Sequence, residues 1–387
     1  MANIHLDPAA LGTVAGEIRR RMDDGHIPGA CAAVWYKDQP VYSCCLGAAD
    51  ETGRPLQSDS VFHMASMTKP FTGVAVMQQV EAGRLSIDEP ISKYFPAFAN
   101  MQVADYADDK RTKVVGSHPA PRQITVADCL THTSGIGFGP AFDTHKELRL
   151  QPGEGLSHLA PRYAEALLYN DPGTLTSYSP IAAPDVLAAI VEQLSGESWP
   201  EYIQNHICRP LGMKDTAFGI SEEARPRLVQ GFAMKDGKCV PDRIRDAEFY
   251  DDLPFLISGG AGLFSTLDDY VRFARMLLRG GELDGARILR EESVQAFSRP
   301  LLAPDVKGVS ATFNWSYLFY VRTGKAGNQV LNKGSYGWSG AFGTHFFVDP
   351  SLSLLGVLLT NTTTAGGAGA ITAADFERAV MSAVRLD

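Results

Sequence analysis

A serine and a lysine stand three positions apart in the segment HMASMTKP (residues 63–70), where a loop leads into an apolar stretch. If a helix begins at Ser66, both side chains share one face, and the free N–H groups of the first turn point to where an oxyanion would form. A lysine in an apolar setting is less stable as a cation and can take or relay a proton. Ser66 could therefore be a nucleophile that a substrate acylates, with Lys69 as its base. The same residues also fit Ser66 as a helix cap beside a solvated Lys69.

A second candidate is Tyr178 in PGTLTSYSP (residues 172–180). Glycine and proline favour a loop here, and Pro180 is typical of a helix start, so Tyr178 can point into a cleft. A phenol next to a lysine cation ionises more readily and can act as a general base. The alternative is a packed tyrosine whose hydroxyl is satisfied by a hydrogen bond.

The third segment is YGWSGAFG (residues 336–343), which enters an alternating strand through His345 and Phe347. Its glycines would let the backbone pass close to a ligand. A backbone N–H there, together with that of Ser66, could form an oxyanion hole. A glycine-rich hairpin with Trp338 in the core fits the same residues.

In this order and spacing, the three segments resemble the serine β-lactamase and penicillin-binding protein family, and within it class C β-lactamases and family VIII carboxylesterases. The segments LTHTSG (130–135), PLGM (210–213) and SGGAGLFST (258–266) also look like family segments, with structural functions. The resemblance implies that Ser66, Lys69 and Tyr178 are the catalytic residues. It also implies an oxyanion hole formed by the N–H groups of Ser66 and Ala341. Substrate binding would fall to Trp338, Ser339 and Gly340.

The chain departs from the family pattern at two positions. Pro180 replaces the asparagine of Tyr-x-Asn, and Trp338-Ser339-Gly340 replaces Lys-Thr-Gly, as is typical of the esterase relatives. The lost cation would have bound the carboxylate of a β-lactam or a peptide C-terminus, so we predict a serine hydrolase that forms an acyl-enzyme on small carboxylic esters. An acyltransferase or amidase of the same fold is the alternative, and β-lactamase or D-peptidase activity is disfavoured. A catalytically dead binding protein would not need to retain Ser66, Lys69 and Tyr178 together.

No G-x-S-x-G segment occurs, which excludes the nucleophile elbow of α/β-hydrolases. No two of the nine histidines lie within five positions of each other, so the sequence carries no local zinc signature, and neither a metal nor a cofactor is implied.

Periodicity and turn residues predict the elements that must position this chemistry. Helices are expected after Asp7-Pro8, over 66–82, 185–194 and 268–278, and from Thr372 to about Val384; strands are expected at 30–36, 41–47, 313–321, 341–348 and 353–360. We therefore predict an α+β, class C β-lactamase-like fold. Terminal helices would flank an antiparallel sheet of about five strands, and a mainly helical lobe would be inserted. The expected domains are a discontinuous sheet domain (1–65 and 300–387) and a helical lobe (66–299), with the active site in the cleft between them.

The formal net charge of −9 disfavours a nucleic-acid partner, and Arg19 to Arg21 fit a solvated helix face. No apolar run approaches membrane-spanning length and no signal peptide is evident, which predicts a cytoplasmic protein without a membrane partner. The six cysteines form no C-x-x-C pair and are expected to be free thiols. The expected partner is a small-molecule ester or amide, and the oligomeric state is left open.

Overall fold

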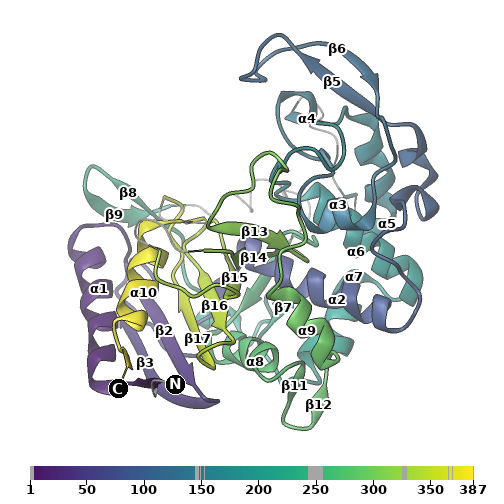
Figure 1. Cartoon of the computed structure of the whole chain (residues 1–387). Coiled ribbons are helices and arrows are strands. Elements are labelled where there is room, and N and C mark those ends of the chain that lie inside the picture. Colours follow the sequence, from purple (N-terminus) through teal and green to yellow (C-terminus); the bar gives the residue numbers. More distant parts are fainter. Residues whose placement is uncertain are drawn as a thin grey trace.

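The computed structural model describes residues 4–143, 148, 150–151, 153–242, 256–324, 329–364, 366–367 and 369–386. Its largest sheet has seven strands in the order β13-β14-β15-β16-β17-β2-β3, and each strand is antiparallel to its neighbours. The sheet is therefore assembled from both ends of the chain (Figure 1).

The strands are β1 (Ile4–Leu6), β2 (Gly29–Tyr36), β3 (Gln39–Gly47), β4 (Phe62–His63), β5 (Gln102–Tyr106), β6 (Val114–Pro119), β7 (Ala217–Phe218), β8 (Phe232–Lys235), β9 (Lys238–Pro241), β10 (Leu263–Ser265), β11 (Glu282–Leu283), β12 (Ala286–Arg287), β13 (Phe313–Ser316), β14 (Phe319–Arg322), β15 (Tyr336–Ser339), β16 (His345–Asp349), β17 (Leu354–Leu359) and β18 (Val384–Leu386). The α-helices are α1 (Gly12–Asp23), α2 (Lys69–Glu81), α3 (Val126–Leu130), α4 (Pro140–Asp143), α5 (Leu156–Leu159), α6 (Ala182–Ser195), α7 (Trp199–Ile203), α8 (Leu267–Leu278), α9 (Glu291–Phe297) and α10 (Ile371–Met381).

The sheet is wider than the five or so strands expected from the sequence. The segment 313–321 is not one strand: β13 and β14 form a hairpin whose turn residues, Tyr317 and Leu318, have φ values of 49° and 66°. Residues 336–339 form the separate strand β15, and Ala341 lies in the turn that follows it. Two extra strands result. The β13–β14 turn lacks the residues that usually mark a turn, whereas the turn between β15 and β16 contains Gly340 and Gly343.

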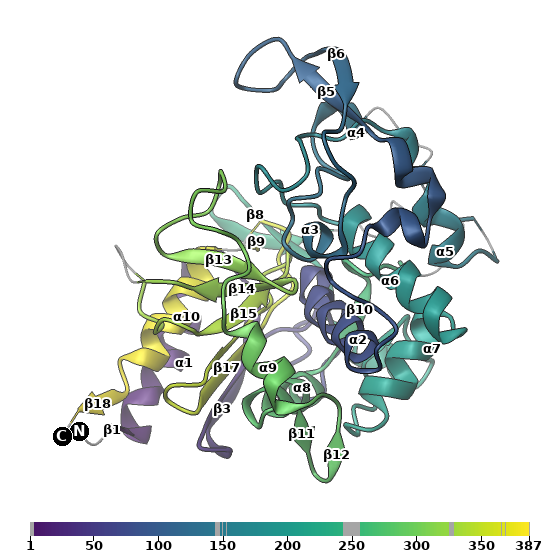
Figure 2. The same ribbon diagram turned by 45° about the vertical axis from the view of Figure 1, so that its right-hand side comes forward.

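Helices cover both faces of the sheet, and the terminal ones do so as expected. The terminal helices α1 and α10 pack against each other, with α1 also on β2 and β3 and α10 on β17 (Figures 1 and 2). The amphipathic helix α8 covers the opposite face, where Tyr270 and Phe273 contact Phe346 of β16. The short strands β1 and β18 pair with each other, so the two ends of the described chain lie side by side.

The helix that follows Ser66 joins the sheet to the helical part of the chain. On one side, α2 packs against α6. On the other, Gly73 of α2 meets the β13–β14 turn so closely that a Cβ on Gly73 would lie 2.1 Å from the carbonyl oxygen of Tyr317. Figure 2 shows α2 between the sheet and helices α3, α6 and α7. Whether the two parts divide at the predicted residues stays a prediction.

Two cysteines are paired, contrary to the expectation of free thiols. Cys31 of β2 and Cys45 of β3 are directly opposite in the ladder and form a disulfide. This pairing depends on strand register, which cysteine spacing alone does not reveal. Cys44, Cys129, Cys208 and Cys239 are free. Among the described helices, none is both long enough and apolar enough to cross a membrane.

Candidate active site

Ser66 lies on a tight turn between a short strand and a helix. Residues Ala65–Thr68 form a 3₁₀ turn, and α2 proper begins at Lys69 rather than at Ser66. Because a 3₁₀ turn has three residues per turn, Ser66 and Lys69 still share one face. Ala65 has a φ of 47°, a left-handed conformation that is unusual for a residue other than glycine and often marks a functional turn.

Lys69 is fully buried and makes three hydrogen bonds to neutral oxygens. Its Nζ donates to the carbonyl oxygen of Pro180 at 2.5 Å and to that of Gly260 at 2.9 Å, and it lies 3.3 Å from Ser66 Oγ. The three protons of the ammonium group can therefore all be accommodated without a carboxylate among these contacts. Pro180, which stands where the family has asparagine, takes part here through its backbone.

Tyr178 completes the cluster that the sequence predicted. Its hydroxyl donates a hydrogen bond of 2.8 Å to Ser66 Oγ, and Lys69 Nζ lies 4.9 Å from the centre of its ring. Ser66 Oγ is thus within hydrogen-bond reach of both a lysine and a phenol. The structure brings Ser66, Lys69 and Tyr178 together from segments more than a hundred residues apart.

Three aromatic rings surround Tyr178 and fix its orientation. Those of His132, Trp315 and Trp338 have their centres 4.7, 6.0 and 5.6 Å from that of Tyr178. Trp338 is buried beside the phenol, so an indole occupies the place where the family pattern has a cation.

His132 holds the backbone on both sides of Tyr178. Its carbonyl oxygen accepts from the N–H of Ser177 at 2.7 Å, and its Nδ1 accepts from the N–H of Ser179 at 3.2 Å. Burial, together with the charge of Lys69, lowers the pKa of His132 well below its usual value, so the ring is neutral and Nδ1 stays an acceptor. His132 also has a φ of 58°.

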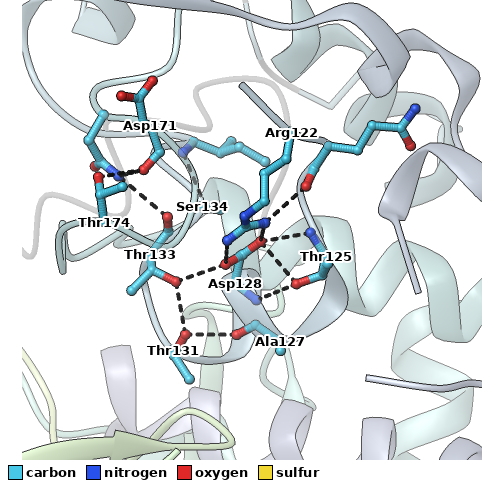
Figure 3. Close-up of polar contacts among 12 residues, drawn as sticks. Arg122, Thr125, Ala127, Asp128, Thr131, Thr133, Ser134, Asp171 and Thr174 are labelled. Carbon is cyan, nitrogen blue, oxygen red and sulfur yellow. Dashed lines mark hydrogen bonds and ion pairs between the residues drawn. The ribbon is translucent and has the colours of Figure 1, made fainter. Parts of the chain in front are cut away.

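The loop that carries His132 is itself tied down by a buried carboxylate (Figure 3). Thr125 and Asp128 form a capping box at the start of α3. Asp128 also accepts two hydrogen bonds from the guanidinium of Arg122, at 2.6 and 2.8 Å, and one from the hydroxyl of Thr133 at 3.1 Å. Because Thr133 follows His132 directly, this network positions the histidine that positions Tyr178.

A second buried carboxylate positions the loop that receives Lys69. Asp185 of α6 accepts hydrogen bonds from Ser258 Oγ at 2.5 Å, from the N–H of Gly259 at 2.8 Å and from the hydroxyl of Tyr163 at 2.8 Å. The next carbonyl, that of Gly260, is the one that binds Lys69. Burial raises the pKa of Asp185 to about 6, even though its hydrogen bonds and Lys69 act in the opposite direction.

The turn after β15 touches the backbone just before Ser66. The N–H of Gly340 bonds the carbonyl of Thr344, and Thr344 Oγ1 donates to the carbonyl oxygen of Met64 at 3.1 Å. A Cβ on Gly340 would lie only 2.4 Å from that same Met64 oxygen. Phe342 packs against Ala65, so Ala341 is flanked on both sides by residues that contact the Ser66 turn.

Ser339 faces away from this cluster. Its Oγ bonds His345 Nδ1 at 2.8 Å, and both residues lie on the face of the sheet that α10 covers. The side chains of Trp338 and Ser339 alternate because they are neighbours on one strand. The structure therefore does not bring the Ser339 hydroxyl to Ser66, although the sequence analysis placed it among the substrate-binding residues.

Several supporting residues of the site were not singled out from the sequence. His132 and the loop 258–260 lie in segments that the resemblance marked as structural, and that was the available signal for them. Asp185 and Trp315 carry no local signal, since each reaches the site through contacts with distant segments. Among the described residues, no group of three or more His, Cys, Asp or Glu side chains is arranged to hold a metal ion.

Comparison with known proteins decides the family. The family model described as Beta-lactamase matches residues 14–379. The chain belongs to the Beta-lactamase family. Its fold is the one shared by penicillin-binding proteins and related esterases, so the α+β, β-lactamase-like prediction is confirmed.

Named relatives in this family include esterases and acyltransferases. Esterase EstB of Burkholderia gladioli is 30% identical, over 97% of this chain and 98% of its own. Acyltransferase mokF of Monascus pilosus is 31% identical, over 73% of this chain and 69% of its own. The solved structure of EstCE1, described as a hydrolase with promiscuous acyltransferase activity, has a TM-score of 0.80 at 23% identity and covers 97% of this chain and 99% of its own, which shows the common fold.

Proposed function

We propose that the protein is a serine carboxylesterase that cleaves small, uncharged esters through an acyl-enzyme on Ser66. The observation that carries the proposal is the position of Ser66 Oγ, 2.8 Å from the Tyr178 hydroxyl and 3.3 Å from the nitrogen of a buried lysine. This is the geometry expected of a nucleophile next to its base. The relationship to esterase EstB supports the same reaction class.

In the proposed reaction, Ser66 Oγ attacks the ester carbonyl carbon, and its proton passes to the Lys69–Tyr178 pair. The pair then returns the proton to the departing alkoxide, which leaves as an alcohol. Water attacks the acyl-enzyme in the second half, with the pair acting again as base and then as acid towards Ser66. The acid product and the original Ser66 are thereby regenerated.

We assign the oxyanion hole to the backbone N–H groups of Ser66 and Ala341. Gly340 supports this assignment because its missing side chain lets the β15 turn lie against the Met64 carbonyl. Two such donors act on the negative charge that develops on the carbonyl oxygen. Trp338 would form an apolar wall for the acyl or alcohol part of the substrate.

The indole at Trp338 is also the basis for expecting poor turnover of β-lactams. A β-lactam has a carboxylate beside its scissile amide, and a charge-assisted hydrogen bond to it is worth roughly 1.5–3 kcal/mol, or about one to two powers of ten in kcat/KM. An uncharged ester needs no such contact, and its alkoxide leaves more readily than an amine.

The proposal is tested by trapping and by substrate choice. A fluorophosphonate should add one label per chain, which peptide mapping should place on Ser66. Ser66→Ala should abolish labelling and reduce p-nitrophenyl butyrate hydrolysis by up to roughly 10⁶-fold with the fold intact. Substantial esterase activity in Ser66→Ala would refute the mechanism. If nitrocefin were cleaved as efficiently as the ester, a β-lactamase would be the better description.

The relationship to acyltransferase mokF favours one alternative, in which the acyl group passes to an alcohol or amine rather than to water. The acyl-enzyme would be the same, and only the acceptor would differ. Adding a primary alcohol to the p-nitrophenyl butyrate reaction distinguishes the two. Product analysis that finds mostly butyrate supports the esterase, whereas mostly butyrate ester of the added alcohol supports the transferase.

A further inference from the structure

A cavity of about 540 Å³ lies between strands β14 to β16 and helix α10. This volume is within the range of pockets that bind small organic molecules. None of the three residues Ser66, Lys69 and Tyr178 lines this cavity. The cavity is therefore distinct from the Ser66 cluster, although Trp338, the proposed wall of the active site, also contributes to its lining.

Two glycines shape the packing of the sheet next to this cavity. Gly337 lines the cavity, and a Cβ there would lie 2.1 Å from the carbonyl oxygen of Phe346. The Phe347 ring lies over Gly356 of β17, where a Cβ would come within 2.6 Å of it, and packs against Phe376 of α10. Strand β16 thus lies close against Gly337, and the Phe347 ring lies over Gly356 beside the cavity.

Buried polar groups line one wall of this cavity. Ser335 is fully buried, and within the described part of the chain its hydroxyl has no hydrogen-bond partner. Arg322 is 8% exposed; its terminal nitrogens bond Tyr320, Gln329 and Glu377, but its Nε has no partner among the residues described. Arg322 and Ser335 are neighbours across the ladder, joined by a backbone hydrogen bond of 2.8 Å. Unsatisfied buried donors cost stability, and a ligand with acceptor oxygens would satisfy them.

The charged side chains around the cavity form ion pairs, so the unpaired donors of Arg322 and Ser335 are what favours a ligand with acceptor oxygens. Glu377 is held ionised: burial alone would raise its pKa, but His345 and Arg322 lower it overall. Arg322 and Arg378 also line the cavity, and Arg322 pairs with Glu377. Arg378 pairs with Asp375, but Asp375 also pairs with Arg20 and Arg21, so one carboxylate is shared by three guanidinium groups. Arg20 and Arg21 also pair with Glu17 and Asp24, so the positive charges of this network are balanced.

The remaining wall is apolar. Leu331 and Phe347 are buried, whereas Ile371 at the start of α10 is 47% exposed, which is unusual for a large apolar side chain. An apolar residue in contact with both the cavity and solvent is well placed to cover the body of a small ligand.

We propose that this cavity binds a small organic carboxylate, with its oxygens on Arg322 and Ser335 and its apolar body against Leu331, Phe347 and Ile371. The ligand is not consumed there. The site is a second binding site on a chain whose proposed chemistry takes place at Ser66.

The experiment is calorimetric titration with benzoate, and with benzamide as its uncharged counterpart of the same shape. Benzoate should bind once per chain and about tenfold or more tighter than benzamide, as a charge-assisted hydrogen bond predicts. Ser335→Ala should weaken benzoate roughly tenfold. Ala374→Trp should fill the cavity from α10 and abolish binding.

Two controls separate this site from the proposed active site. Protein labelled on Ser66 by a fluorophosphonate should bind benzoate as well as unlabelled protein does. Ser335→Ala and Ala374→Trp should leave p-nitrophenyl butyrate hydrolysis within about twofold of the wild-type rate. The inference is overturned if benzoate does not bind, if benzamide binds equally well, if labelling displaces benzoate, or if binding survives both substitutions. Should Ala374→Trp not fold, Ser335→Ala and the labelled protein still decide the question. A protein that fails to react with the fluorophosphonate would count against the proposed function only.

Discussion

Lys69 carries its charge in a fully buried position in which its three hydrogen bonds go to neutral oxygens. A buried ammonium without a carboxylate partner is costly, and such a cost persists where the group has a function. Tyr178 is the neighbouring side chain that can share a proton with Lys69, and both side chains lie within hydrogen-bond distance of Ser66 Oγ. At the scale of single residues, the site is therefore one proton-transfer unit rather than two independent side chains.

We expect Lys69→Ala and Tyr178→Phe each to remove most of the p-nitrophenyl butyrate activity, and the double variant to lose little more. Groups that act as one unit show this lack of additivity. Steady-state kcat/KM for the four proteins gives the coupling directly. Two losses that multiplied in the double variant would show that the residues act separately.

Element boundaries decide how closely the β15 turn approaches the nucleophile. The N-terminal end of β15 pairs with β14, and its C-terminal end leads into the Gly340–Thr344 turn against Met64. The predicted oxyanion donor, Ala341, depends on this contact. A side chain on Gly340 would collide with the Met64 carbonyl at 2.4 Å and with Thr344 Oγ1 at 2.2 Å.

Gly340→Ala should therefore lower kcat by roughly a hundredfold, since one oxyanion donor is worth about that or more. KM should change much less, and the protein should remain folded. Gly16→Ala on α1 is the matched control, because a Cβ there meets nothing within 4 Å. It should leave kcat unchanged and leave stability equal or slightly higher. An unchanged kcat in Gly340→Ala would remove the β15 turn from the mechanism.

Local patterns predicted most of these elements, and the failures have physical causes. The apolar composition of α2 and the apolar period of α6 and α8 are local signals, so the sequence located these helices to within a few residues. The β13–β14 hairpin was missed because apolar and aromatic residues continue through Tyr317 and Leu318, neither of which is a typical turn residue. The Ser66, Lys69 and Tyr178 cluster was predictable from motif spacing. The supports of that cluster, such as Asp185 beneath the Gly260 carbonyl, were not, because they are defined only by tertiary contacts.

Over the whole molecule, buried ionisable groups such as Asp185 link the site to stability. Asp185 is 1% exposed, and burial raises its pKa from 3.8 to about 6. Between these two values, the unfolded chain has released a proton that the folded chain still holds. The contribution of Asp185 to the free energy of unfolding is therefore fully present below pH 3.8 and is lost as pH rises to about 6.

We expect Asp185→Asn to gain about 3 kcal/mol in unfolding free energy relative to the wild type when the pH rises from about 3.5 to 7, as two pKa units imply. The variant has no carboxyl group to ionise at this position, so it does not show this loss of stability as the pH rises. Urea unfolding followed by tryptophan fluorescence at both pH values measures it. A difference between the two proteins that does not change with pH would contradict the assignment.

The pairing of β2 with β17 also sets the order of events when the chain is made. Cys31 of β2 lies opposite Leu359 of β17, and most of β2 is buried in the finished sheet. On the ribosome, the β2–β3 hairpin can form early, but its other edge stays unpaired until Leu354–Leu359 has been synthesised. At roughly 5–20 residues per second, that interval is tens of seconds. An apolar strand edge is open to other nascent chains throughout this time. Misassembly is therefore a hazard of synthesis, long before the nucleophile has a substrate to meet.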